Sequence, residues 1–185
     1  MRKALAVILL VLGAATVLAV SAFARGGDEK NSFKATLNGY NETVGGAGAT
    51  STGSVSTAAR GSFRAKLTDG GTKLDFTHTY SGIEGGTVTQ AHPHFAQNHV
   101  GGAIFGFFCG GPKAACPSPG GTVEGTWTAA DIIGPADQGV QAAAFDKFVR
   151  ALRAGAVYVN VHSSGATPSY PEGEIRGQVS AANDD

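Results

Sequence analysis

The sequence predicts an all-β domain, an antiparallel sandwich or barrel with one amphipathic helix near residues 137–154. Three observations support this prediction. Short segments alternate apolar and polar residues, as strands with one buried face do. Glycine, with 28 of the 185 residues, separates these segments and marks turns. One stretch only, before Gly155, has helical spacing instead.

The alternation is clear in Phe33–Leu37, where apolar residues occupy the odd positions. Because successive side chains of a strand point to opposite faces, one set faces a core and the other set faces away. The same pattern occurs at 63–67, 74–81, 157–162 and 174–179. Further strand candidates are Gly53–Ala58, Thr87–Phe95, Gly102–Phe108 and Gly121–Thr128. About nine short strands separated by turns are typical of a sandwich or barrel.

The segment 136–154 departs from this pattern. Its apolar residues recur every four positions, at Val140, Ala144, Phe148 and Leu152. Asp137 near the start and Gly155 after the end are suitable helix-terminus signals. We expect one helix that covers an edge or an open end of the sheet.

The first 24 residues predict a secretory signal peptide. Arg2 and Lys3 precede a long apolar run over 4–20, and Ala22-Phe23-Ala24 has the small-x-small form of a cleavage site. The alternative is a membrane anchor, but the run is shorter than the ~20 apolar residues that a spanning helix needs. The sequence therefore predicts a secreted or periplasmic protein without a stable membrane anchor after cleavage.

The remaining chain predicts a single domain. Residues 25–31 are a polar, flexible N-terminal segment, residues 32–180 form the β-domain, and residues 181–185 are a loose C-terminus. The whole chain has 14 basic and 14 acidic residues, and the basic ones form no run. This distribution makes nucleic acid a poor partner candidate.

The two cysteines, Cys109 and Cys116, enclose six residues that are flexible enough to close a ring. In an oxidising compartment a disulfide is the expected state of such a pair. A metal-ligand role is the weaker interpretation, because zinc sites usually place their paired cysteines closer together.

Two motifs resemble one known family. The first is Ala91-His92-Pro93-His94. The second runs from Tyr158-Val159-Asn160-Val161-His162 to Gly173-Glu174-Ile175-Arg176-Gly177-Gln178. Their order and spacing resemble the CHRD domain, the module named after chordin, over residues 32–180. The chain departs from that pattern at Pro93, where an aliphatic residue is usual, and in the insertion that carries the two cysteines.

The resemblance implies an extracytoplasmic β-fold of immunoglobulin-like type. In chordin such modules belong to a secreted protein that binds signalling ligands, and in bacteria they often stand alone behind a signal peptide. It implies a non-enzymatic binding or interaction module, whose partner is an extracellular protein or a small ligand. No nucleophile elbow, phosphate loop or dinucleotide motif is present in the sequence, which also favours a non-enzymatic role.

Three histidines support an alternative function. His92 and His94 are two residues apart, so on a strand they project to the same face, and His162 ends a distant strand. Their imidazoles could bind one copper or zinc ion, with His78 or His99 as a further ligand. The arrangement is similar to part of the copper site of Cu/Zn superoxide dismutases, although that enzyme's two metals need more histidines than this chain has. The cofactor is therefore none or a single copper or zinc ion.

The same histidines have a structural interpretation, in which their ring nitrogens satisfy buried backbone groups, and a catalytic one as acid or base. Asn160, Glu174 and Arg176 are expected on the same face. They would either orient metal-binding imidazoles or form a cross-strand network that fixes the register. We expect His78 to face the core, because it shares the face of Phe76 and Tyr80.

Overall fold

The computed structural model describes residues 30–44 and 53–182. The predicted signal peptide and most of the segment 25–31 lie outside the described residues. Within the described ranges, no helix is long and apolar enough to cross a membrane.

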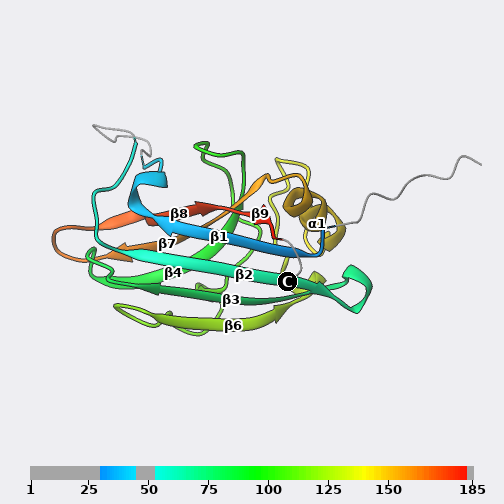
Figure 1. Cartoon of the computed structure of the whole chain (residues 1–185), viewed down its shortest axis with the longest axis horizontal. Helices are drawn as coiled ribbons and strands as arrows, with labels where there is room; N and C mark the ends of the chain where they lie inside the picture. Colours follow the sequence, from blue (N-terminus) through cyan, green and yellow to red (C-terminus); the bar gives the residue numbers. More distant parts are fainter. Residues whose placement is uncertain (1–29, 45–52, 183–185) are drawn as a thin grey trace, which may run out of the picture.

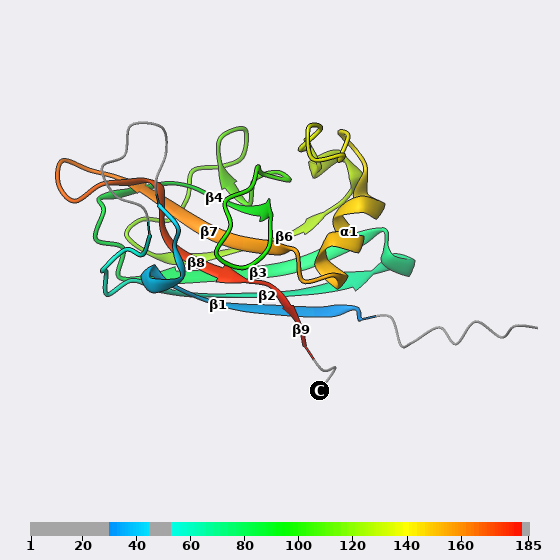
Figure 2. The same cartoon turned by 90° about the horizontal axis from the view of Figure 1, so that it is seen from above.

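Nine strands in the described residues form one antiparallel sheet that folds over on itself (Figure 1). Their order is β5-β4-β7-β8-β1-β2-β3-β6, and β9 pairs with β1. Figure 2 shows that β8, β7 and β4 form one layer and that β1, β2 and β3 form the other. The bounds are β1 Ser32–Asn38, β2 Arg60–Thr68, β3 Lys73–Ser81, β4 Thr87–Phe95, β5 Cys109–Gly110, β6 Gly121–Trp127, β7 Val157–Ser164, β8 Tyr170–Gln178 and β9 Ser180–Ala181. This architecture confirms the predicted antiparallel sandwich or barrel with a single α-helix.

The core lies between the two layers and consists of the alternating apolar residues. In β2 it takes Phe63, Ala65 and Leu67, and the intervening residues are exposed or half-buried. In β7 it takes Val157, Val159 and Val161. Rings from β2, β3, β6 and the loop before β5 pack together at its centre, at offset or edge-on angles that aromatic pairs prefer. The period-two pattern thus predicts the core face of these strands correctly.

The predicted helix is present but shorter. The helix α1 covers Phe145–Arg153, and the residues from 137 to 144 form turns and extended chain instead. Gly139 and Ala143 both have positive φ, a conformation that an α-helix cannot include. The helix buries Phe148 and Leu152 against the core, as its spacing predicts. Three short 3₁₀ helices complete the elements: η1 Gly39–Asn41, η2 Asp69–Gly71 and η3 Ala129–Asp131.

Two predicted strands are wrong. The segment 53–58 is extended chain with one isolated bridge, Val44 to Gly53. The segment 102–108 is a loop that touches β4 through a bridge between His94 and Ile104. The segment 102–108 makes three backbone hydrogen bonds to β4, between Phe95 and Ala103, Phe105 and Pro93, and Phe108 and Ala91, but it does not form a continuous ladder. In the segment 53–58, Val55 and Thr57 are buried although the segment is not part of the sheet.

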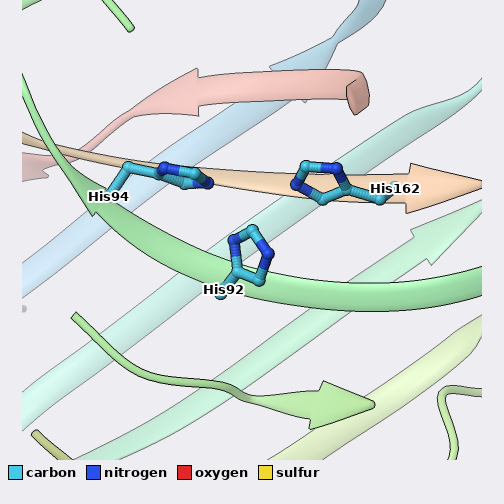
Figure 3. A group of neighbouring side chains, drawn as sticks. All are labelled: His92, His94 and His162. Carbon is cyan, nitrogen blue, oxygen red and sulfur yellow. The ribbon is translucent and has the colours of Figure 1, made fainter. Parts of the chain in front are cut away.

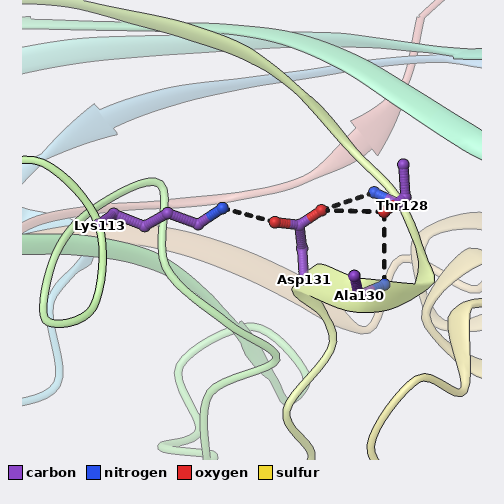
Figure 4. Close-up of polar contacts among 4 residues, drawn as sticks. All are labelled: Lys113, Thr128, Ala130 and Asp131. Carbon is purple, nitrogen blue, oxygen red and sulfur yellow. Dashed lines mark hydrogen bonds and ion pairs between the residues drawn. The ribbon is translucent and has the colours of Figure 1, made fainter.

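The cysteine loop is fixed at two points. Cys109 and Cys116 form the predicted disulfide. Lys113, inside the loop, makes a 2.5 Å ion pair with Asp131, which also accepts hydrogen bonds from Thr128 at the start of η3 (Figure 4). The disulfide loop is therefore attached to the segment that follows β6.

Candidate metal centre

Strand register brings the polar residues of β4, β7 and β8 into rows. In the β4–β7 pair His92 is opposite Asn160, and in the β7–β8 pair Asn160 is opposite Arg176. His162 lies two residues beyond Asn160 on the same face, opposite Gln90. Because directly opposed residues of antiparallel strands project to the same face, these side chains gather on one face of the layer. The other face of the same strands carries the apolar core residues.

The three predicted metal ligands converge (Figure 3). One ring nitrogen from each of His92, His94 and His162 lies within 4.8 Å of the others, and all three side chains are buried. Three atoms at these separations all lie within about 2.8 Å of one point, which is 4.8 Å divided by √3. Zinc–imidazole bonds are about 2.0–2.1 Å long, so small side-chain movements suffice for coordination.

Backbone carbonyls hold two of the rings. His94 Nδ1 lies 2.7 Å from the carbonyl oxygen of Gly102, and His162 Nδ1 lies 2.8 Å from that of Pro171. A carbonyl only accepts, so each Nδ1 carries the proton and donates it. The Nε2 atom of each neutral ring is then left with its lone pair, the form that binds a metal.

Both Nε2 atoms face the same oxygen. Asn160 Oδ1 lies 3.0 Å from His94 Nε2 and 3.0 Å from His162 Nε2. With both rings neutral, the two Nε2 atoms and Asn160 Oδ1 all carry lone pairs, and no hydrogen atom lies between them. These contacts are therefore repulsive. Two extra protons would relieve this arrangement, but burial lowers the pKa of His94 to about 4 and also lowers the pKa of His162.

His92 completes the cluster from the other side. Its ring centroid is 4.5 Å from that of His94 and 4.5 Å from that of His162. Its Nδ1 is buried without a hydrogen-bond partner, and Phe107 packs edge-on against the ring. Burial, with the neighbouring His162 and His94, lowers the pKa of His92 to about 2. At neutral pH all three rings are therefore uncharged.

The carboxyl group of Glu42, which the sequence did not predict as part of the site, is buried next to Asn160. Glu42 follows η1, is 3% exposed, and accepts a hydrogen bond from the Asn160 carboxamide. Burial raises its pKa to about 7, although Arg176 nearby acts in the opposite direction. Gly173 leaves room for this contact, because a Cβ there would lie 2.6 Å from Glu42 Oε1 and 2.9 Å from Asn160 Nδ2. No sequence pattern links residue 42 to residue 160.

Arg176 and Glu174 have different surroundings. The Arg176 guanidinium stacks 3.3 Å above the Tyr158 ring and donates to the carbonyls of Gln97 and Val100. It therefore ties the loop after β4 to the cluster. The Glu174 carboxylate instead accepts four hydrogen bonds, from Thr57 Oγ1, Ser163 Oγ and the backbone N–H groups of Glu84 and Gly85. It anchors the β3–β4 connection and makes no hydrogen bond to the histidines.

The two remaining histidines lie away from the cluster. His78 is fully buried, as predicted, between the rings of Phe63, Tyr80 and Phe108. Its Nδ1 donates to the carbonyl of Ser62, and burial lowers its pKa to about 4. His99 is exposed on the loop after β4. Neither belongs to the group of ligand atoms found among the described residues.

A partly open cavity of about 440 Å³ adjoins the cluster. His94, His162 and Asn160 form part of its wall, and Glu42 and Glu172 also line it. The site thus has access from solvent on the side of His94 and His162, whereas His92 lies against Phe107.

Comparison with known proteins supports the predicted family. No curated protein and no solved structure matches the chain. The family profile of the CHRD domain matches residues 33–179, a range that includes β1 from its second residue and all of β2 to β8, and ends just before β9. The chain therefore belongs to the CHRD domain family.

Proposed function

We propose that this chain is an exported CHRD module that binds one copper or zinc ion through His92, His94 and His162. One observation carries the proposal. The backbone carbonyls of Gly102 and Pro171 accept hydrogen bonds from the Nδ1–H groups, so two Nε2 lone pairs face the Asn160 oxygen, each at 3.0 Å. A cation bound by the imidazoles uses these lone pairs and removes the repulsion, which protons cannot remove because burial disfavours the charged rings.

The donor set suits these metals. Neutral imidazole is a common ligand of copper and zinc, and the two carbonyl-bound rings have the outer hydrogen bonds that orient metal-binding histidines. A metal-free network can satisfy the same atoms if the Asn160 carboxamide turns over and a protonated Glu42 donates to its oxygen. Metal binding and this closed network predict different results in the experiment below.

The proposal includes the compartment. The signal-peptide pattern of residues 1–24 and the disulfide between Cys109 and Cys116 both favour a secreted or periplasmic protein. The role proposed is binding, with the metal ion as the ligand. An extracellular protein partner remains a prediction, which recovery of bound proteins from the native envelope or culture medium tests.

Metal analysis of the purified mature protein, residues 25–185, tests the proposal. We expect one copper or zinc per chain after loading and removal of loosely bound metal. The His92→Ala/His94→Ala variant should retain less than a tenth of that amount. The matched control is His99→Ala, which removes an exposed imidazole outside the cluster and should leave the stoichiometry unchanged.

Equal metal uptake by the wild type and the double variant would overturn the proposal. A wild type that takes up no metal would do the same and would favour the closed network of Glu42, Asn160 and the two rings. Circular dichroism of each variant shows whether a loss of metal comes from unfolding instead, and His94→Gln provides a less disruptive replacement if the double variant does not fold.

A further inference from the structure

The cavity beside the cluster offers access to a fourth position around the proposed ion. Its wall includes His94, His162 and Asn160, whereas His92 approaches from the opposite side. Among the described residues, no carboxylate or cysteine joins the three histidines as a ligand. Three protein ligands and an accessible fourth position are the arrangement of reactive zinc and copper sites, in contrast to closed structural sites.

The charge of the site indicates which ligands can enter the cavity. Three neutral imidazoles do not compensate the two positive charges of a divalent ion, and the buried Arg176 adds a third. Two carboxyl groups line the cavity: Glu42, whose pKa burial raises to about 7, and the exposed Glu172, so they offset this positive charge only in part. An anion from solvent reduces this excess most directly.

The cavity also holds one polar atom that has no hydrogen-bond partner among the described residues. Glu42 lines the cavity, and its Oε1 is buried without a hydrogen bond, although the carboxyl group also accepts one from Asn160. Two exposed residues of the cavity wall, Gly101 and Ala103, have no side chain large enough to close it. A small anion at the fourth position would thus meet a cation and, when Glu42 carries its proton, a hydrogen-bond donor.

We propose that this cavity is a binding site for a small anion, which enters past Gly101 and Ala103 and occupies the fourth position beside His94 and His162. The inference rests on the proposed function, since it needs the metal ion. It adds the class of ligand and the path by which the ligand enters.

Azide titration of the copper(II)-loaded mature protein tests this inference. We expect a saturable change in the visible absorption band and in the electron paramagnetic resonance spectrum, with one azide bound per copper. Gly101→Trp should weaken azide binding at least tenfold while the copper content stays the same. A Cβ at Gly101 meets no atom within 4 Å, so the substitution fits the backbone, and the indole covers the entrance.

Two further variants control the experiment. Ala103→Trp places the same indole at another point of the entrance and should have the same effect. Ala130→Trp places it on η3, on an exposed residue outside the cavity wall, and should leave azide binding unchanged. Full copper binding with no spectral response to azide, or an equal response in the Gly101→Trp and Ala103→Trp variants, would overturn the inference and leave the metal proposal intact. Absence of copper binding would overturn both.

Discussion

The two layers of this domain use the same alternating pattern in opposite ways on the faces that point away from the core. On β2 and β3 those faces are open to solvent and carry Lys66, Asp75 and other polar residues. On β4, β7 and β8 the corresponding residues are buried, and they include the three histidines of the cluster. Period-two patterning therefore determines which residues share a face but not whether that face is covered.

The loop after β4 covers one of the two faces. The chain from 96 to 102 lies over polar residues of β4 and β8, and its backbone carbonyls accept hydrogen bonds from their side chains. Gly102 accepts from His94, Gln97 and Val100 accept from Arg176, and Ala96 accepts from Gln178. Polar residues on the covered face are thus hydrogen-bonded to backbone, as burial requires, whereas those on the open face are exposed to water.

Replacing one carboxylate on the covered face and one on the open face should give the largest difference in stability. Glu174→Ala should lower the free energy of unfolding by about 3–5 kcal/mol, because four buried donors lose their acceptor. Glu124→Ala, which removes an exposed acceptor of Thr77, should cost less than about 0.5 kcal/mol. Urea denaturation measures both. Similar losses of stability in the two variants would show that burial of the covered face does not increase the contribution of its carboxylate.

Acid should act on the metal-free protein mainly through buried histidines. The folded pKa values of His78, His92 and His94 lie at about 4 or below, against an ordinary value near 6.5. Below that value the unfolded chain binds more protons, so stability falls as the pH drops. Glu42 opposes this trend, since its raised pKa favours the folded state on acidification.

Three histidines lower the free energy of unfolding on acidification, and one carboxyl group, Glu42, raises it. At about 1.4 kcal/mol per group and pH unit, the free energy of unfolding should fall by on the order of 3 kcal/mol between pH 7 and pH 5. Denaturation of the metal-free protein at several pH values measures it. Unchanged or higher stability at pH 5 would contradict the assignment of neutral buried imidazoles.

Asn160 should affect metal affinity more than any residue of the open face. Asn160→Ala should weaken copper or zinc binding 10–100-fold, the usual effect of removing a group that orients metal ligands. Thr77→Ala, on the open face of β3, should leave the affinity unchanged. Competition with a chelator of known affinity measures both. Equal affinity in the wild type and Asn160→Ala would show that the carboxamide does not take part in the site.

A further effect concerns Glu42 and depends on pH. The folded pKa of about 7 lies above the ordinary 4.5, so the wild type loses stability as the pH rises from about 4.5 to 7. Glu42→Gln cannot ionise, so it should be more stable than the wild type by about 3 kcal/mol at pH 8 and by less than about 1 kcal/mol at pH 5. Thermal unfolding at the two pH values tests this, and a variant that is less stable at pH 8 would contradict it.

The sequence predicts the faces of this molecule better than its loops. Alternation identifies the core residues of β2 and β7, and the spacing of His92 and His94 places them together because residues two apart on a strand share a face. His162 joins them through the β4–β7 register, which the structure shows and the spacing of residues does not reveal. The disulfide between Cys109 and Cys116 was predictable from their spacing together with the signal-peptide pattern.

Other features depend on tertiary contacts that leave no periodic signal. Glu42 reaches Asn160 across 118 positions of the chain, and only Gly173 makes room for that contact. The late start of α1 results from positive φ at Gly139 and Ala143, which helical spacing alone does not reveal. The segment 102–108 has the pattern of a strand, but the structure gives it only one isolated bridge and three backbone hydrogen bonds to β4.

The central claim is that His94 and His162 keep their protons on Nδ1 and direct their Nε2 lone pairs at a common ion. Long-range ¹H–¹⁵N spectra of the imidazole rings test it directly in a protein of residues 25–185. We predict neutral Nδ1–H tautomers for both rings at pH 7 without metal, and a large shift of both Nε2 signals when one equivalent of zinc is added. Nε2–H tautomers, or spectra that zinc leaves unchanged, would contradict the claim.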